Sequence, residues 1–223
     1  MDYSTIFNPL FLCAKTVGVN LVLFLTIGVF LAFLLSKENF RFKWVLNTIV
    51  TLPLIFPPIA IGFFLLLLLG RDGIIGGVFY KFDISFIFSF SSLVIAGFIA
   101  GLPLMVKPLQ SVIEQFPKNI IEASYLSGKS KLRTFLFIIL PSIKKSLLAC
   151  LLIACARALG EVGITLMLGG NIIGKTDTIS LAIYNAVFDG DYNLALILSG
   201  ILIVISLIFF IILNFLQTKT NHI

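Results

Sequence analysis

Charged residues are scarce in this sequence: Asp, Glu, Lys and Arg together make up 12% of its 223 residues, about half the share found in soluble domains. Hydrophobic residues make up 59%, and the mean hydropathy is +1.13. A globule of this composition could not cover its own surface with polar groups, which excludes a water-soluble fold. We therefore expect an all-α, polytopic membrane bundle whose solvent is lipid.

Residues that ligate metals or act as nucleophiles are also rare. The single histidine, His222, lies in a polar tail, and Cys13, Cys150 and Cys155 lie inside apolar segments without metal-ligand spacing. We expect the cysteines to be small core- or lipid-facing side chains. Neither a metal site nor a cofactor is expected. A membrane enzyme would need a cluster of His, Cys or carboxylates near one interface, so the chain is predicted to be non-catalytic.

Five long apolar segments are present, at residues 10–35, 45–69, 85–106, 134–156 and 194–216. Each is long enough to cross about 30 Å of hydrocarbon as a helix. A sixth apolar piece, 164–168, is too short to cross, and a re-entrant or interfacial turn suits it better. Five spans use nearly all of the chain, which predicts a single transmembrane domain over residues 1–223. The N-terminus has no positive region or cleavage site, so the first segment is interpreted as a retained span.

The distribution of Lys and Arg predicts the orientation. Eleven of the sixteen fall on one side of the five predicted spans: Lys37, Arg41, Lys43, Lys107, Lys118, Lys129, Lys131, Arg133, Lys144, Lys145 and Lys219. The positive-inside rule makes this side cytoplasmic, with the N-terminus outside and the C-terminus in the cytoplasm. The net charge of +6 is scattered between apolar runs. It therefore indicates orientation, and nucleic-acid binding is not expected.

The basic connection between the third and fourth segments contains a predicted short helix. Pro117 and Gly128 are typical of the beginning and end of a helix. Ile121, Tyr125 and Leu126 would form an apolar face. A helix of two or three turns is marginal alone in water, so this face should rest on something. The residues leave two alternatives, which are packing on the chain's own bundle and docking of a cytoplasmic partner.

The same stretch resembles the EAA loop of the permeases of ABC importers. The family pattern is Glu-Ala-Ala, three residues, Gly, nine residues and Ile-x-Leu-Pro. The chain departs from it only by a serine in place of the second alanine. The residues that match are Glu122, Ala123, Ser124, Gly128, Ile138, Leu140 and Pro141.

This resemblance implies a type I importer permease whose coupling helix, in a loop over about 109–133, sits in a groove of a cytoplasmic ABC ATPase dimer. Gly128 can adopt the positive φ that ends such a helix. The resemblance also implies a second copy of the chain, with the pore on the two-fold axis, and an external oxyanion-binding protein. ATP hydrolysis belongs to the separate ATPase subunit.

Further motifs resemble the oxyanion branch of these permeases. Residues 52–58 followed by 70–73 are similar to molybdate permeases. The run over 156–163 is shared with sulfate permeases. Residues 170–184 resemble the molybdate branch more than the sulfate branch. The resemblance therefore implies an importer of molybdate, with sulfate and tungstate left open.

Two features mark a candidate translocation pathway. Arg157 and Glu161 lie at the end of the fourth segment with the spacing of one helix face. They form either a structural ion pair or, since charge in a membrane by default marks function, a pathway cation whose grip the carboxylate tempers. Pro57 and Pro58 interrupt the second segment, which predicts a kink beside the pore or a kink that only shapes the bundle.

Residues 169–176 match the pattern of a phosphate-binding P-loop. That chemistry requires a strand before the loop and an α/β domain around it, so we reject this interpretation. The segment instead lies on the predicted outer side, where its backbone N–H groups and one lysine could contact a binding protein. The candidate residues for this contact are Gly170, Asn171, Gly174 and Lys175.

An ion-driven secondary transporter is the rival interpretation. Such a transporter would carry acidic residues deep in its spans. The five long segments contain neither Asp nor Glu. This absence favours the ATP-driven importer.

Overall fold

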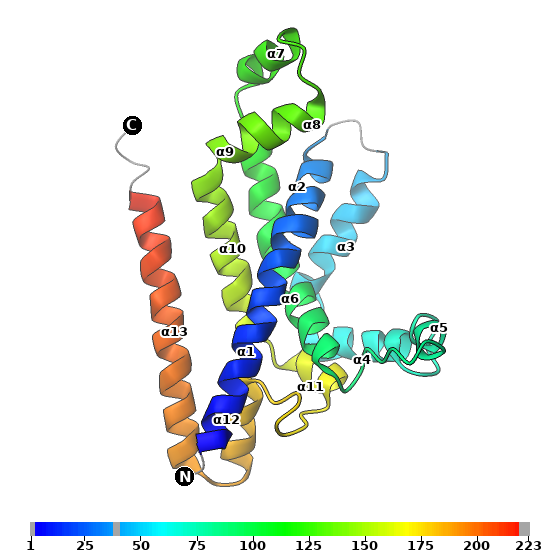
Figure 1. The fold of residues 1–223 in the computed structure, drawn as a ribbon, viewed down its shortest axis with the longest axis vertical. Coiled ribbons are helices and arrows are strands. Elements are labelled where there is room, and N and C mark those ends of the chain that lie inside the picture. The colour runs from blue at the N-terminus through cyan, green and yellow to red at the C-terminus, as the bar shows by residue number, and fades with distance from the viewer. Residues whose placement is uncertain (1–2, 38–40, 219–223) are drawn as a thin grey trace.

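The computed structural model describes residues 3–37 and 41–218. Within these ranges every regular element is a helix (Figure 1), which confirms the expected fold class. Met1, Asp2, Lys219 and His222, which entered the sequence predictions, lie outside the described residues. Among the described residues, three helices are long and apolar enough to cross a membrane, or up to four if one bent pair counts as a span.

The first, third and fifth predicted spans are confirmed as long helices. The first is continuous through α1 (Tyr3–Leu23), a π-helical turn η1 (Phe24–Gly28) and α2 (Val29–Ser36). The third is α6 (Phe90–Glu114) and the fifth is α13 (Tyr192–Thr218). The helix α6 extends past the predicted boundary at Val106, so Lys107 lies inside it and not in the following connection.

The second predicted span is not one helix, which corrects the prediction of five spans. It is divided into α3 (Lys43–Ile55) and α4 (Pro58–Leu69). At about 1.5 Å per residue, neither reaches the ~30 Å of a bilayer core. A residue that precedes proline is pushed out of the helical region. Phe56 and Pro57 both precede prolines and are extended, with ψ of 145° and 131°.

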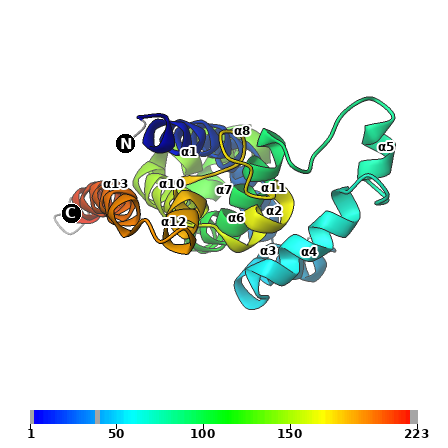
Figure 2. The same cartoon turned by 90° about the horizontal axis from the view of Figure 1, so that it is seen from below.

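The helix α4 runs across the bundle, and the short α5 (Gly76–Tyr80) follows at its far end. Both project from the side of the bundle in Figures 1 and 2. The predicted kink at Pro57 and Pro58 is therefore confirmed, and it is a complete break in the helix.

The fourth predicted span is bent by 80°. Its first part comprises α8 (Lys131–Thr134), the π-helical turn η2 (Phe135–Ile139) and α9 (Leu140–Ser142), and its second part is α10 (Lys144–Leu159). Pro141 lies beside the bend at Ile143. Proline removes one helical hydrogen bond and its ring crowds the turn before it, which here is the π-helical turn η2.

The helix α6 lies at the centre of the bundle and packs on α10, α2 and α1. Small residues allow its close contact with α10. A β-carbon added at Gly101 would lie only 2.6 Å from the carbonyl oxygen of Ala154. Lipid provides no hydrophobic drive between helices, so such close backbone approach is a main source of packing energy. Cys150 and Cys155 are buried on the inner face of α10, and Cys13 is buried in α1, as expected.

The two ends of the bundle carry different short helices. The helix α7 (Lys118–Leu126) lies at one end with α8. Toward the other end lie α11 (Gly163–Gly169) and α12 (Ile179–Phe188). The helix α11 covers the predicted short piece 164–168 and packs on α4 and α6. The helix α1 begins near α12, whereas α13 ends toward α7 (Figure 1).

The contact at Gly101 generates a prediction about stability. We expect Gly101→Ala to destabilise the purified protein by about 1–3 kcal/mol, because even a methyl group must displace the α10 backbone. Gly18→Ala is the matched control, because a β-carbon there would meet no atom within 4 Å. The measurement is the midpoint of thermal unfolding in detergent. Equal midpoints for the two variants would contradict the account.

Candidate functional site

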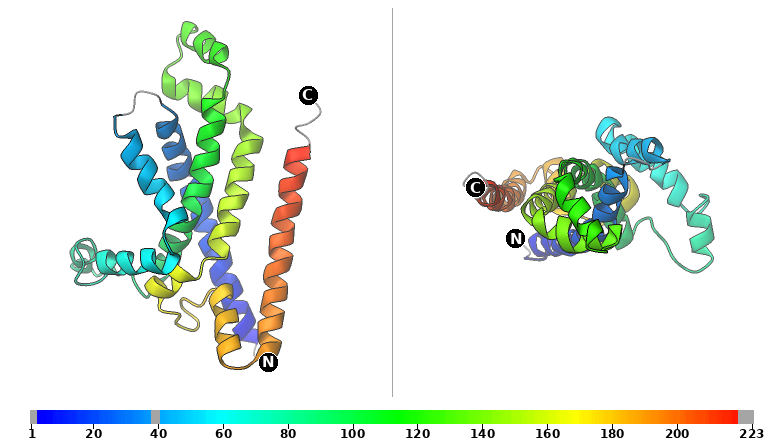
Figure 3. Two further views of the ribbon diagram at one scale, coloured as in Figure 1. Left: turned by 180° about the vertical axis from the view of Figure 1, so that it is seen from behind. Right: turned by 90° about the horizontal axis from the view of Figure 1, so that it is seen from above.

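The short helix that was predicted between Pro117 and Gly128 is present as α7. It begins at Lys118 directly after Pro117, and its end is followed by Gly128 with a φ of +77°. Residues other than glycine rarely adopt this left-handed conformation, which explains the glycine. The helix stands beyond the end of the bundle (Figure 3). Its position and both of its boundaries agree with the prediction.

A buried pair of hydroxyls ties α7 to the rest of the chain. The side chains of Ser124 and Thr134 are both buried, and their oxygens lie 2.8 Å apart. The Thr134 hydroxyl also donates to the Ser130 carbonyl at 3.1 Å. Ser124 is then the donor within the pair. The serine that departs from the family pattern therefore makes a specific contact that alanine could not make, and sequence reasoning did not find its partner Thr134.

The apolar residues of α7 divide between two directions, which corrects the single apolar face that was expected. Ile121 is half-buried against the bundle core, whereas 90% of Leu126 is exposed. Glu122 and Ala123 are exposed as well. Packing of α7 on its own bundle is therefore confirmed at Ile121, and docking of a partner on the exposed residues stays a prediction.

The last residues of the EAA pattern lie at the bend. Ile138 and Leu140 are half-buried, and Pro141 is exposed. Leu140 packs against the core cluster that α2, α6 and α10 share. These three residues shape the turn from α8 into α10, whereas Glu122 lines the groove between α7 and the ends of α2 and α6, and Ala123 is exposed.

At the opposite end, Arg157 and Glu161 form the ion pair that their spacing allows. The Arg157 guanidinium lies 2.7 Å from Oε2 of Glu161, whose side chain is 2% exposed against 35% for Arg157. The other carboxylate oxygen, Oε1, accepts the backbone N–H of Ile164 at 2.8 Å. That N–H belongs to the first turn of α11, where backbone donors lack helical partners. Glu161 therefore has a clear structural role.

The prolines of the second segment lie at the same junction. A β-carbon added at Gly163 would be 2.9 Å from Cβ of Pro58 and 3.0 Å from the backbone nitrogen of Ile59. The beginnings of α4 and α11 are thus in direct contact. The structure brings the two halves of the candidate pathway, Pro57–Pro58 and Arg157–Glu161, to one place.

The loop over 170–178 is closed by its own hydrogen bonds, contrary to the expectation that it offers free backbone donors. The N–H of Ile172 donates to Oγ1 of Thr176, and that of Gly174 donates to Oδ1 of Asp177, both at 2.8 Å. Gly170, Lys175 and Thr176 also donate within the protein. Burial raises the pKa of the Asp177 carboxyl, although the Gly174 N–H opposes the shift. Asp177 therefore takes up a proton more readily than an exposed aspartate.

The remaining candidate contacts of this loop are side chains. Asn171 and Asn185 exchange amide hydrogen bonds of 2.5 and 3.1 Å, which fixes the base of the loop. Lys175 and Ile173 are exposed. The loop follows the helix α11 and precedes the helix α12, so the strand that a P-loop requires is not there. This geometry supports the rejection of nucleotide binding at 169–176.

The described residues form a bundle with helices of membrane-spanning length and a short, partly exposed helix that projects from one end. Comparison with known families identifies its class. Residues 25–222 match the family of binding-protein-dependent transport system inner membrane components, and the chain belongs to this family. The resemblance to ABC-importer permeases is thereby confirmed.

Individual relatives are similar over most of the chain. A putative molybdenum transport system permease protein, YvgM, of Bacillus subtilis is 33% identical over 220 residues, covering 98% of this chain and 96% of its own. The molybdenum transport system permease protein ModB of Haemophilus influenzae is 37% identical, covering 72% of this chain and 71% of its own. The sulfate transport system permease protein CysT of Escherichia coli is 27% identical, covering 86% and 69%.

The Glu161 contacts predict a graded loss of stability. Glu161→Gln keeps an oxygen that can accept the Ile164 N–H, whereas Glu161→Leu leaves this donor unsatisfied. We expect the leucine variant to be less stable than the glutamine variant by about 1–3 kcal/mol. Asp191→Leu is the control, because Asp191 is exposed and accepts the Leu194 N–H at 3.0 Å, where water can replace it. Thermal unfolding in detergent measures the stability of all three variants. Equal stability of the two Glu161 variants would contradict a stabilising hydrogen bond between the Glu161 side chain and the Ile164 N–H.

Proposed function

We propose that the chain is the membrane permease subunit of an ATP-driven importer of molybdate. It makes and breaks no covalent bonds itself. A cytoplasmic ABC ATPase dimer supplies the free energy, and an external binding protein delivers the anion. The observation that carries this proposal is α7, a short helix that is anchored on one side and open on the other.

The anchoring of α7 suggests how closure of the ATPase reaches the bundle. The helix follows α6 through Gln115–Pro117, and the Ser124–Thr134 hydroxyl pair attaches it to α8. A displacement of α7 therefore acts on α6 and, through the bend at Ile143, on α10. A groove of about 610 Å³ lies between α7 and the ends of α2 and α6, which leaves room for such movement.

Molybdate is proposed as the cargo because molybdenum permeases are among the relatives that match most of the chain. Sulfate is a second candidate, since a sulfate permease is also similar over 86% of the chain. Tungstate has the same charge and tetrahedral shape as molybdate and is an outcome of the test. The external binding protein is expected to make most of the distinction between these anions.

We further propose a homodimer with its pore between the two copies. Most of the apolar surface of α13 is not covered by the rest of the chain, so it is available to contact a second copy. The orientation that fits has α7 and the end of α13 in the cytoplasm, with the beginning of α1 outside. The loop over 170–178 would then face the binding protein through Lys175 and Ile173, with Gly170, Asn171 and Gly174 shaping it. Arg157, which is partly exposed, would attract the anion at the outer end of the pathway.

The exposed side of α7 predicts a specific loss of assembly. Leu126→Asp should abolish co-purification of the ATPase subunit, because the substitution places a charge in the proposed contact. The fold should persist, since the side chain is 90% exposed. Ile173→Asp is the matched control: Ile173 is 82% exposed in the loop over 170–178, and this variant should retain the ATPase. Equal ATPase recovery with both variants would contradict the proposal.

Transport itself is tested by reconstitution with the ATPase and the binding protein in vesicles. Molybdate uptake should require ATP and should not be driven by a proton or sodium gradient. Excess sulfate or tungstate added with labelled molybdate identifies the preferred anion. Uptake that an ion gradient supports without ATP would favour the secondary transporter instead.

A further inference from the structure

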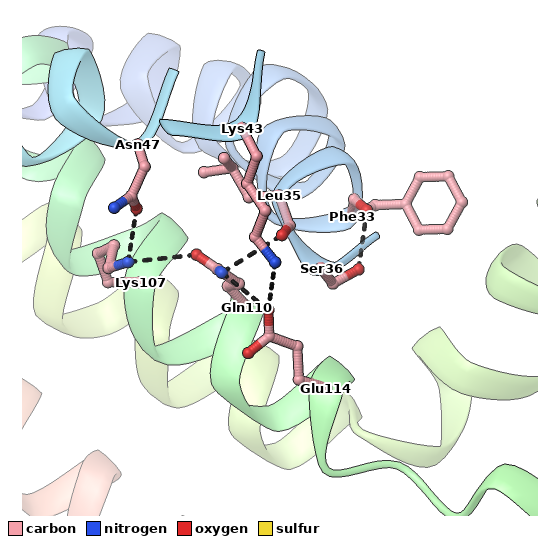
Figure 4. Close-up of polar contacts among 8 residues, drawn as sticks. All are labelled: Phe33, Leu35, Ser36, Lys43, Asn47, Lys107, Gln110 and Glu114. Atoms are coloured by element: carbon pink, nitrogen blue, oxygen red, sulfur yellow. Dashed lines mark hydrogen bonds and ion pairs between the residues drawn. The ribbon is translucent and has the colours of Figure 1, made fainter. Parts of the chain in front are cut away.

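A partly buried polar network is separate from α7 and from the Arg157–Glu161 pair. It connects α3 to α6 near the end that carries α7 (Figure 4). Lys107 is its central cation. The residue lies seven positions before the end of α6, which is about 10 Å inside the helix. A cation inside a membrane helix is costly and needs partners.

The partners of Lys107 are neutral. Its amine donates to Oδ1 of Asn47 at 2.7 Å and to Oε1 of Gln110 at 3.3 Å. The nearby carboxylate of Glu114 accepts from Lys43 at 3.2 Å and from Nε2 of Gln110 at 2.9 Å. In this network two lysines thus share one carboxylate, which leaves a charge of +1 on the side of Lys107.

Asn47 connects this charge to a cavity. Because its Oδ1 is held by Lys107, the amide is oriented and its Nδ2 is the end that can donate to another group. Asn47 also lines a shallow surface cavity of about 260 Å³, whose lining residues all belong to α3 and to Phe56 at its end. The cavity has a polar end formed by Asn47, Thr48 and Thr51 and an apolar end formed by Leu52, Ile55 and Phe56.

Polar side chains on the outer surface of a membrane helix face a water-filled passage or a partner far more often than lipid. The cavity opens on the surface of one chain, on α3, just before the helix breaks at Phe56. A pathway between two copies would run along such a face. The hydroxyls of Thr48 and Thr51 donate to carbonyls of their own helix, so Asn47 is the available donor among these three.

We infer that Asn47 and Lys107 form an anion-binding station on the cytoplasmic half of the pathway. The Asn47 amide contacts the oxyanion directly, and Lys107 orients that amide and supplies a positive charge that, among the described residues of the network, shares the Glu114 carboxylate with Lys43. The cargo itself completes the charge balance of the network as it passes. This inference rests on the proposed function, because the anion is the one that the importer carries.

A purely structural role of Lys107, as a tie between α3 and α6, makes different predictions. A tie would be kept or strengthened by Asn47→Asp, because the new carboxylate would pair with the Lys107 amine. The same substitution removes the amide donor and places a negative charge where the oxyanion should bind. Asn47→Asp therefore separates the two roles while it preserves the size of the side chain.

The experiment measures molybdate uptake and ATP hydrolysis by the permease reconstituted with its ATPase and binding protein. We expect Asn47→Asp to lower uptake by about tenfold, with ATPase assembly and thermal unfolding like those of the wild type. Lys107→Gln, which keeps hydrogen-bonding capacity but loses the charge, should also lower uptake strongly. Lys107→Arg keeps the positive charge and should retain most of the wild-type uptake. Lys144→Gln removes an exposed charge at the start of α10 and should leave uptake unchanged.

Wild-type uptake by Asn47→Asp or Lys107→Gln would overturn the inference and leave the proposed function intact. If Lys107→Arg lost as much uptake as Lys107→Gln, and both variants had reduced thermal stability, Lys107 would have a structural role. That result would also overturn the inference. Absence of ATP-dependent uptake by the wild-type complex would instead contradict the proposed function.

Discussion

The bundle is organised around the close contact between α6 and α10, and α1 and α2 pack against the same central helix α6. The two helices meet where Gly101 allows the backbone of Ala154 to approach. With little hydrophobic drive between helices in lipid, such contacts and internal hydrogen bonds hold the bundle together. Both helices also lead toward α7, one through Phe116 and the other through the bend at Ile143. A rigid centre is therefore joined directly to the element that is open to a partner.

Different kinds of polar contact hold the two ends of the bundle together. At the end that carries α7, amides and lysines are partly exposed between α6 and α3, and a buried hydroxyl pair joins α7 to α8. At the other end, Glu161 is fully enclosed and joins α10 to α11, where Gly163 brings in the beginning of α4. The first end is suited to contacts that change as a partner closes. The second holds its elements in one arrangement, with Arg157 as the partly exposed cation.

Hydropathy and motif spacing were sufficient for the fold class, three long spans, the short helix α7 and the family. They failed where a local rule is overridden by packing. Pro103 and Pro108 lie inside α6 without interrupting it, whereas Pro57 and Pro58 separate α3 from α4; only the adjacent pair forces two successive residues out of the helical region. The hydropathy boundary at Lys107 was misleading because Asn47 and Gln110 satisfy the amine inside the helix. The partner of Ser124 and the internal bonding of the loop over 170–178 depend on tertiary contacts, which spacing does not reveal.

We propose that α7 meets an ATPase on the cytoplasmic side of the membrane. The most direct measurement is site-specific photocrosslinking in cells from a reactive amino acid placed at position 123, on the open side of α7. The account predicts one dominant product, the permease joined to the ATPase subunit, and protection of the position from a membrane-impermeant reagent added outside. A position that external reagent modifies, or that yields no ATPase product, would contradict it.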